Sequence, residues 1–358
     1  MKSYKICIVS PSLSNGGIER ALTNLSDSFV KEGHSVIFIA CRRGQHFYSL
    51  NENVVFCEPP FTHNNSGIHK ITTYFKIVRF LEKKYKEFKP DVILSFGDTI
   101  NPLAILGNSS TNIPIYISDR ISPKQKLSAS VDFLKRISYK KATGIIAQTT
   151  QAADYKRLVF GDGLNIRIIP NSLRAIKEQH VEKENWIIAV GRLSFEKGVD
   201  RLIDAFSKIE EKGNWKLVLV GDGPSRTELE SKVDSYGLKE CVHFLGARKD
   251  VDFLLAKSRI YVIPSRCEGF PNALCEAMAS PLPCIAFDSV PTENLIDDNK
   301  SGIVVPDGDI EKLALSIETL MHNESLRKLY AKNAYVIRER LNPKKISKKF
   351  LDFILEKL

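Results

Sequence analysis

The 358-residue sequence predicts an α/β protein made of two doubly wound domains, each built around a parallel sheet. Its length is sufficient for two domains of about 150–200 residues each. Short apolar runs rich in β-branched residues, several of them ending at Gly or Ser, alternate with stretches of helical periodicity. Such continuous apolar runs are typical of strands that are covered on both faces. Hydrophobic residues make up 43% of the chain and charged residues 26%, a balance that excludes a disordered or fibrous protein.

The expected strands are the apolar runs at 5–9, 92–94, 115–118, 166–169, 186–190, 217–220 and 259–263. Apolar residues recur at three- and four-residue spacing in the expected helices, which are 18–32, 72–88, 199–211, 225–236 and 309–320. After strand 166–169 the chain is polar and aperiodic as far as Asn185. We therefore predict a first domain at 1–170, a linker at 171–185, a second domain at 186–342 and a C-terminal helix at 343–358.

Targeting and metal-binding signals are weak in this sequence. No apolar run reaches the roughly 18–20 residues that a membrane-spanning helix needs, and no signal-peptide pattern follows Met1. The seven cysteines form no CxxC pair, which favours a reducing cytoplasm over a disulfide framework or a structural zinc site. The histidines show no metal-ligand spacing, and we interpret the triplets Asp250–Asp252 and Asp307–Asp309 as solvated surface. No metal is therefore expected.

The positive charge is concentrated in the first half of the chain. Residues 1–170 carry 23 lysines and arginines against 13 acidic residues, whereas residues 171–358 carry 29 of each. This imbalance indicates an anionic partner, either a membrane surface, a nucleic acid or a phosphorylated substrate, and the alternative is an ordinary solvated surface. Segments 72–89 and 133–141 both mix cationic with apolar residues, and the second is the better candidate for lying on an anionic membrane.

The densest motif follows strand 259–263 and runs from Pro264 to Met278. Pro271 suits the first position of a helix, where its missing N–H costs nothing. The amides of residues 272–274 would then form an anion site at the helix N-terminus.

Two glutamates accompany this helix start, Glu268 before it and Glu276 inside it. Eight helical residues rise about 12 Å, more than the roughly 5–9.5 Å between the carboxylates of a glycoside hydrolase. We therefore prefer glutamates that accept hydrogen bonds from vicinal hydroxyls. An anion site beside a diol acceptor is what a nucleotide sugar requires.

Two further motifs lie between a predicted strand and a predicted helix. In segment 191–198, Arg192 and Lys197 could together hold a diphosphate. In segment 14–20, the paired glycines Gly16 and Gly17 allow the backbone to approach a ligand closely. No GxGxxG or GxxxxGK[ST] spacing occurs, so a dehydrogenase is weakly supported and a phosphate-loop ATPase is not supported.

Together these motifs resemble the retaining GT-B glycosyltransferases of glycosyltransferase family four, and the resemblance covers essentially the whole chain. Its strongest element is the Glu-x7-Glu motif formed by Glu268 and Glu276. The resemblance implies two Rossmann-like domains facing a central cleft, with the C-terminal helix crossing back onto the first domain. It also implies a metal-independent reaction with no cofactor, because Arg192, Lys197 and the helix dipole would take the metal's place.

The resemblance further implies roles for single residues. Arg192 and Lys197 would hold the donor diphosphate, Glu268 would contact the donor sugar, and these three are the expected catalytic residues. Glu276 would take the ribose hydroxyls. The remaining expected donor-binding residues are Gly16, Gly17, Gly246, Gly269, Phe270, Pro271, Asn272, Ala273 and Leu274.

The sequence departs from the family pattern in three places. Many members have a histidine after the strand at 115–118, where this chain has Asp119 and Arg120, which we place at the acceptor. Ser280-Pro281 stands where a glycine usually follows the helix, and Val290-Pro291 replaces the usual Gly-Pro. These departures affect loop detail and sugar selectivity rather than the reaction class.

The expected activity is transfer of a hexose or N-acetylhexosamine from a nucleotide sugar, with UDP favoured, to a glycan acceptor on a lipid diphosphate. Such an enzyme would be peripheral at the cytoplasmic face of the inner membrane, in bacterial surface glycan assembly, with no nucleic-acid partner. One alternative is a nucleotide-sugar 2-epimerase of GT-B architecture, although the motifs lack the histidines that it usually employs. The other is a non-catalytic binder of a nucleotide sugar or a membrane. The donor sugar, acceptor and linkage are left open by the sequence.

Overall fold

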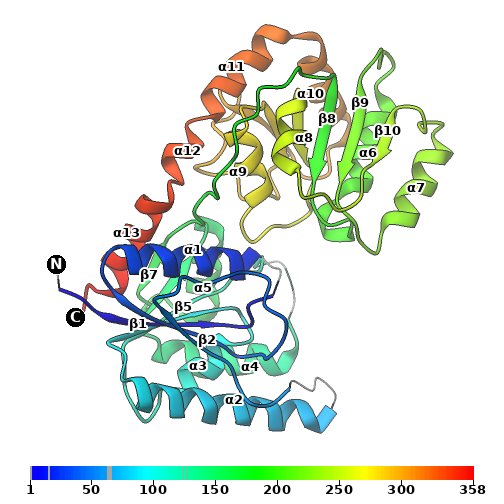
Figure 1. Cartoon of the computed structure of the whole chain (residues 1–358). Helices are drawn as coiled ribbons and strands as arrows, with labels where there is room; N and C mark the ends of the chain where they lie inside the picture. The colour runs from blue at the N-terminus through cyan, green and yellow to red at the C-terminus, as the bar shows by residue number, and fades with distance from the viewer. Residues whose placement is uncertain (1, 15–16, 63–66, 124, 126) are drawn as a thin grey trace. The chain divides into compact units, whose positions relative to one another are not determined.

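The structure, a computed structural model, describes residues 2–14, 17–62, 67–123, 125 and 127–358 (Figure 1). The chain forms two compact units. The N-terminal unit comprises Met1–Ser172 and Asn342–Leu358, and the C-terminal unit comprises Leu173–Leu341. Among the described residues, no helix has the length and apolar character needed to cross a bilayer.

The N-terminal unit is built on a seven-stranded sheet in the order β3-β2-β1-β4-β5-β6-β7, and every neighbouring pair is parallel. Its strands are β1 (Lys5–Ser10), β2 (Ser35–Ala40), β3 (Val54–Cys57), β4 (Val92–Phe96), β5 (Ile115–Ser118), β6 (Gly144–Ala147) and β7 (Ile166–Ile168). Cys7 of β1 lies opposite Ile37 on one side and Ile93 on the other. Every residue of β4, β5 and β6 is buried, which confirms the expectation of strands covered on both faces.

Helices cover both faces of this sheet. They are α1 (Gly17–Lys31), α2 (Gly67–Phe88), α3 (Asn101–Gly107), α4 (Ala129–Ser138), the single turn η1 (Tyr139–Lys141), α5 (Thr150–Phe160) and α13 (Pro343–Ile354). Helices α2, α3 and α4 pack in sequence, α3 lying against both of the others, whereas α1 packs against α13 (Figure 1).

The C-terminal helix α13 returns to the N-terminal unit, as predicted. Asn342 caps it, because its side chain accepts hydrogen bonds from the amides of Lys344 and Lys345. The rings of Phe350 and Phe353 then pack on strand residues: Phe350 stacks on Phe96 with centroids 6.0 Å apart, and Phe353 meets Tyr116 edge-on at 5.0 Å. These aromatic contacts dock the helix onto the sheet.

The C-terminal unit repeats the architecture with a six-stranded parallel sheet in the order β10-β9-β8-β11-β12-β13. Its strands are β8 (Trp186–Val190), β9 (Lys216–Val220), β10 (Val242–Phe244), β11 (Ile260–Ile263), β12 (Cys284–Phe287) and β13 (Gly302–Val305). Its helices are η2 (Phe195–Lys197), α6 (Val199–Lys208), α7 (Arg226–Ser235), α8 (Val251–Lys257), α9 (Asn272–Ala279), α10 (Ile310–His322), α11 (Glu324–Ala334) and α12 (Ile337–Arg340).

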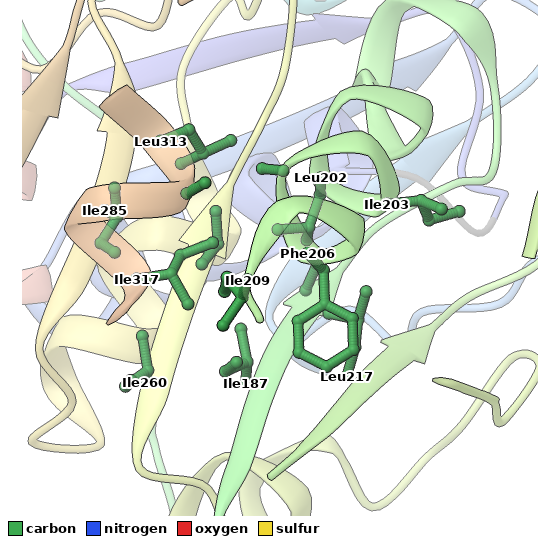
Figure 2. Packing of buried hydrophobic residues seen from close by; sticks show 14 of the residues in the cluster. Ile187, Leu202, Ile203, Phe206, Ile209, Leu217, Ile260, Ile285, Leu313 and Ile317 are labelled. Carbon is green, nitrogen blue, oxygen red and sulfur yellow. The ribbon is translucent and has the colours of Figure 1, made fainter. Parts of the chain in front are cut away.

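The core of this unit lies between the sheet and the helix pair α6 and α10, which pack against one another. Figure 2 shows the fully buried side chains from both helices and from four strands, namely Ile187, Leu202, Ile203, Phe206, Leu217, Ile260, Ile285, Leu313 and Ile317. Each such side chain contributes about 1.5–3 kcal/mol by leaving water. The core therefore gives the loops at the strand ends a rigid support.

Candidate functional site

The predicted donor motifs meet at one point of the second sheet. Strands β8 and β11 are neighbours, yet the chain leaves β8 toward β9 on one side and leaves β11 toward β12 on the other. Ligands of open α/β sheets bind outside the carboxyl ends of the strands at such a switch point. Segment 191–198 directly follows β8, and segment 264–271 directly follows β11. The fold thus brings together two motifs that are far apart in the sequence.

An ion pair joins these two segments. Lys197 Nζ lies 2.7 Å from Glu268 Oε1 and 2.9 Å from Oε2. The Ser265 hydroxyl donates to Glu268 Oε1 at 2.8 Å, so three donor contacts orient this carboxylate. The Glu268 side chain is 11% exposed and that of Lys197 is 30% exposed, which leaves the ammonium group the more accessible partner. The arrangement presents a cation and an ordered carboxylate at the same edge of the sheet.

A close backbone approach holds the two segments against one another. Gly198 has a φ of +62°, and a Cβ at this position would lie 2.1 Å from the carbonyl oxygen of Pro264. Only glycine therefore fits here. The Arg266 amide also donates to the Glu196 carbonyl at 2.9 Å, and the Arg266 guanidinium forms a bidentate pair with Asp200 at 2.7 and 2.6 Å. These contacts pre-organise the segments before any ligand binds.

Arg192 is the other predicted cation of this site. Its side chain is exposed, and it has no hydrogen bond or ion pair to any part of the chain that the structure describes. It follows Gly191 directly after β8, at the same switch point as Lys197. An exposed guanidinium beside a half-exposed ammonium group can bind a diphosphate.

Helix α9 begins one residue later than predicted. Pro271 is the residue before the helix, and its carbonyl accepts the hydrogen bond of the Cys275 amide at 3.1 Å. The Asn272 amide bends back to the Phe270 carbonyl at 2.9 Å, so the expectation of three outward-pointing amides was wrong for Asn272. The amides of Ala273 and Leu274 remain in the first turn, where N–H groups have no partner inside the helix. Gly269 is half-buried and Phe270 is buried, so this turn presents backbone rather than the ring.

Glu276 lies inside α9 with a side chain that is 12% exposed. Arg174 Nη2 donates to its Oε2 at 2.9 Å. The same guanidinium donates to Asp252 at 3.0 and 2.5 Å, so a single arginine connects two carboxylates of different helices. The sequence analysis missed Arg174, because the contact spans 102 residues and leaves no local pattern.

Of the two Asp-x-Asp triplets, which were expected to be solvated surface, Asp250 and Asp307 are exposed as expected, whereas Asp252 is largely buried. Asp252 is 13% exposed and binds Arg174, whereas Asp250 pairs with Arg248. Burial raises the pKa of Asp252, but the hydrogen bonds from Arg174 and from the Lys177 amide outweigh it and lower that pKa below its ordinary value. In the other triplet, Asp307 accepts from Arg201 at 2.7 Å and Asp309 caps α10. No group of three or more potential ligands for a metal ion occurs among the described residues.

The remaining predicted glycines lie at other strand ends. Gly246 follows β10 with a φ of +67°, and its carbonyl accepts the Gly221 amide at 2.8 Å. Gly17 is the first residue of α1, directly after the β1 loop, whereas Gly16 lies outside the residues that the structure describes. The loop after β1 is held by the Ser12 hydroxyl, which donates to the buried Glu19 at 2.7 Å.

Asp119 lies inside a buried polar network at the carboxyl end of β5. Its carboxylate is 2.9 Å from the ammonium groups of both Lys135 and Lys156, and it accepts from the Tyr139 hydroxyl at 2.5 Å and from Asn101 at 3.0 Å. Burial raises its pKa, but the two lysines and the Tyr139 hydroxyl outweigh it and hold the pKa well below the ordinary range. The Asp119 carboxylate thus has four bonding partners inside the N-terminal unit.

Arg120 lies next to this network. Its guanidinium stacks over the Phe96 ring with 4.0 Å to the centroid and donates to the side chain of Asn171. Its amide donates to Asp98 at 3.0 Å, and Lys135 donates to the other oxygen of Asp98 at 2.9 Å. A contact of Asp119 or Arg120 with the acceptor stays a prediction.

Comparison with known proteins agrees with this architecture. The family model described as Glycosyltransferase Family 4 matches residues 15–174, and the model described as Glycosyl transferases group 1 matches residues 174–336. A protein of *Campylobacter jejuni* named GalNAc-alpha-(1->4)-GalNAc-alpha-(1->3)-diNAcBac-PP-undecaprenol alpha-1,4-N-acetyl-D-galactosaminyltransferase is 31% identical over 334 residues, which cover 92% of each chain. The amylovoran biosynthesis glycosyltransferase AmsD of *Erwinia amylovora* is 28% identical over 98% of this chain and 99% of its own length.

Among solved structures, the sucrose-phosphate synthase of *Thermosynechococcus elongatus* has the same fold, with a TM-score of 0.85 at 18% sequence identity. The alignment covers 99% of this chain and 98% of that chain. The predicted fold class and family are thereby confirmed. This chain belongs to glycosyltransferase family four and has the GT-B architecture of two Rossmann-like domains.

Proposed function

We propose that this glycosyltransferase uses a UDP-linked hexose or N-acetylhexosamine and adds the sugar, with retained anomeric configuration, to a glycan carried by a polyprenyl diphosphate. The observation that supports this most directly is the Lys197–Glu268 pair, because it sets a phosphate-binding cation beside a hydroxyl-binding carboxylate at the switch point. The *Campylobacter* relative is named for an acceptor linked to undecaprenol through a diphosphate. That name supports an acceptor of the same class here.

Each donor group has a candidate partner in the C-terminal unit. Arg192 and Lys197 bind the diphosphate, and the first-turn amides of Ala273 and Leu274 bind its distal phosphate at the positive end of the α9 dipole. Glu268 accepts hydrogen bonds from the sugar hydroxyls, and Glu276 accepts those of the ribose. Gly246, in the same unit, is proposed as a backbone contact, whereas a donor contact of Gly17, in the N-terminal unit, stays a prediction.

A donor phosphate would compete with Glu268 for the Lys197 ammonium group. When a phosphate oxygen approaches Lys197 Nζ, the ammonium group shifts part of its hydrogen bonding from Glu268 to the phosphate. This releases acceptor capacity on Glu268 for a sugar hydroxyl, while Ser265 still orients the carboxylate. Donor binding therefore rearranges charges that are already in place rather than recruiting new ones.

The chemical step follows from this arrangement. The acceptor hydroxyl attacks the anomeric carbon from the face that the diphosphate leaves, so the new C–O bond forms as the C–O bond to the phosphate breaks. The hydroxyl proton passes to the departing phosphate oxygen. Arg192 and Lys197 stabilise the negative charge that develops there. Because common UDP-hexosamines are α-linked, the α linkage in the name of the *Campylobacter* relative supports retention.

We further propose that the N-terminal unit rests on an anionic membrane through an exposed face of α4 and η1, formed by Phe133, Arg136, Ile137, Lys140 and Lys141. We name this surface the α4 face. Phe133 is 62% exposed and Ile137 is 49% exposed, four residues apart on one side of the helix. Apolar side chains bordered by cations are typical of a helix that lies in the headgroup region.

The charge of the whole unit supports this orientation. Residues 342–358 add five lysines and two acidic residues to the excess of ten positive charges in the first half, which gives the N-terminal unit a net charge of +13. Helix α2 packs on α3, which also packs on α4, and α2 exposes Ile71 and Phe75 together with Lys76, Arg79 and Lys83. A peripheral position at the cytoplasmic face of the membrane would bring the unit to a lipid-linked acceptor.

An epimerase is the second candidate, and the switch-point segments speak against it. Segments 191–198 and 264–276 contain no histidine. Two of their cations are held in ion pairs, Lys197 by Glu268 and Arg266 by Asp200 of α6. Such pairs suit the binding and stabilisation of a leaving group better than proton transfer at a sugar carbon.

The decisive experiment is a panel of UDP- and GDP-sugars, in EDTA, with and without polyprenyl-diphosphate-linked glycans. We expect release of the nucleoside diphosphate only with one donor and an acceptor, and an unchanged anomeric configuration by NMR. Arg192→Ala should abolish release, whereas Lys208→Ala, which breaks a 2.7 Å ion pair with Glu311 outside the site, should not. An isomerised donor without acceptor would identify an epimerase. Absence of donor binding would identify a non-catalytic protein.

A further inference from the structure

Arg174 connects two carboxylates at the edge of the C-terminal unit. It lies in segment 173–184, which has neither helix nor strand, and its side chain is 21% exposed. Both of its Nη atoms donate to Asp252 of α8, and Nη2 also donates to Glu276 of α9. The Lys177 amide donates to Asp252 as well, at 3.0 Å, and so fixes this segment on α8.

Asp252 fixes the orientation of Arg174, and Arg174 in turn fixes the orientation of Glu276. Asp252 uses both carboxylate oxygens for the two Nη atoms, which fixes the plane of the guanidinium. With its plane fixed, Arg174 holds the carboxylate of Glu276 through one further hydrogen bond. A carboxylate accepts up to about four hydrogen bonds, so the bond from Arg174 does not by itself prevent Glu276 from accepting the hydrogen bonds of a diol. A lysine could not reproduce this fork, because its ammonium is a point charge.

We propose that Arg174 and Asp252 are positioning residues for the nucleoside of the donor, and that they act by holding the Glu276 carboxylate toward the ribose hydroxyls. This inference rests on the proposed function, which gives Glu276 the ribose. Neither residue needs to touch the donor. Their effect is pre-organisation, since Glu276 is already fixed when the donor arrives and loses little side-chain freedom on binding.

The Glu276 carboxylate also needs a cation nearby to offset its repulsion from Asp252. Asp252 and Glu276 are both largely buried, with exposures of 13% and 12%, and two uncompensated carboxylates would repel one another there. Arg174 neutralises this repulsion without a covalent or metal link. Loss of Arg174 would therefore remove this hydrogen bond from Glu276 and leave its carboxylate next to a like charge.

The test is calorimetric binding of UDP and of 2′,3′-dideoxy-UDP, which lacks both ribose hydroxyls. We expect Arg174→Ala and Asp252→Asn to weaken UDP binding roughly tenfold, the value of one charge-assisted hydrogen bond, while dideoxy-UDP binding changes little. Arg174→Lys should restore only part of the UDP affinity. The double variant Arg174→Ala/Glu276→Gln should be no weaker for UDP than Glu276→Gln alone.

The ion pair between Arg248 and Asp250, which precedes Asp252 in the sequence, provides a matched control. Arg248 pairs with Asp250 through two hydrogen bonds of 2.8 and 2.7 Å, and Arg248→Ala should leave UDP binding unchanged. If Arg174→Ala weakened the binding of UDP and dideoxy-UDP equally, or if its effect added to that of Glu276→Gln, the positioning role would be overturned. The proposed UDP donor would not be affected by either result. Absence of UDP binding by the unaltered protein would overturn the UDP donor and this inference together.

Discussion

Lys197 and Glu268 are separated by 71 residues in the sequence, yet the Lys197 ammonium group contacts both oxygens of the Glu268 carboxylate, at 2.7 and 2.9 Å. Their segments follow the carboxyl ends of the neighbouring parallel strands β8 and β11, whose next strands lie on opposite sides of this pair. The two side chains therefore meet at the switch point. In this structure the two side chains neutralise one another. In the proposed complex with the donor we assign them to different parts of it, the diphosphate and the sugar.

This relationship makes Glu268→Gln informative. The change removes a negative charge beside the diphosphate site, so UDP should bind as tightly as before or more tightly. Loss of the carboxylate that orients the sugar should nevertheless lower kcat by about 10²–10³. Steady-state kinetics and calorimetry on the same preparation measure both quantities. Glu311→Gln, which breaks the ion pair with Lys208, serves as the control. Parallel losses in kcat and UDP affinity would contradict the division of roles.

Substitution of Gly198 tests whether the close backbone approach between segments 191–198 and 264–271 is needed for the site. Gly198→Ala would place a methyl group 2.1 Å from the Pro264 carbonyl oxygen and force the two segments apart. Gly213→Ala is the matched control, because Gly213 also has a positive φ, +50°, but nothing lies within 4 Å of its Cβ position. The control should cost about 1–2 kcal/mol of stability from backbone conformation alone.

Gly198→Ala should cost more than the control in the free energy of unfolding, and it should also weaken UDP binding. Urea unfolding and calorimetry measure the two effects. Equal behaviour of the two variants would mean that the approach of Gly198 to Pro264 is not needed for the site.

Fold and site were predictable from the sequence to different degrees. Strand β8 was predicted at its observed bounds, because a parallel strand covered on both faces is a continuous apolar run, and its three central residues are buried. Helix α3 was not predicted, since nearly all of its residues are buried and it therefore has no polar face to create periodicity. Helix α6 ends at Lys208 rather than at residue 211, because Ile209 continues the apolar spacing while its backbone is already extended.

The switch-point loops were predictable because their motifs directly follow apolar strands. Contacts between distant segments were not. Lys135 belongs to a segment that the sequence assigned to a cationic surface, yet it is buried between Asp98 and Asp119. The bond between Arg174 and Glu276 likewise has no local signature. Sequence periodicity predicts which face of an element is apolar, but it does not predict which charged side chain forms a buried ion pair.

The buried network around Asp119 gives a stability prediction. Lys156→Met removes one of two cations from a carboxylate that is 4% exposed, and breaking such a pair should cost about 3–5 kcal/mol at pH 7. Lys86→Met is the control, since the Lys86–Glu82 pair is even shorter, 2.6 Å against 2.9 Å, but its lysine is 55% exposed, so its loss should cost much less. Urea unfolding of the three proteins measures the difference.

The same network predicts a direction for the pH dependence. The folded pKa of Asp119 lies below its unfolded value, so its contribution is present above the unfolded pKa, about 3.9, and is lost as the pH falls through the folded pKa. The stability gap between the unaltered protein and Lys156→Met should therefore be widest near neutrality and narrow below about pH 4. A gap that is constant with pH would mean that Lys156 acts through packing rather than through the charge of Asp119.

The α4 face gives the last prediction, on membrane binding. Phe133→Ser/Ile137→Ser removes its two apolar side chains, which are 62% and 49% exposed. Binding to vesicles that contain anionic phosphatidylglycerol should fall about tenfold or more, because each buried CH₂ contributes about 0.8 kcal/mol. Leu315→Ser/Leu329→Ser, with exposures of 62% and 51% in the C-terminal unit, is a closely matched control.

Activity should separate in the same way. The Phe133→Ser/Ile137→Ser variant should lose turnover on a long-chain polyprenyl acceptor in vesicles, yet retain it on a short-chain, water-soluble acceptor, because the donor site lies in the other unit. Arg136→Glu should weaken vesicle binding further at low ionic strength and less at high ionic strength, as expected for attraction between cations and headgroups. If none of these changes weakened vesicle binding, and the control variant bound vesicles equally well, the α4 face would not be the membrane contact. The contact would then lie elsewhere on the N-terminal unit.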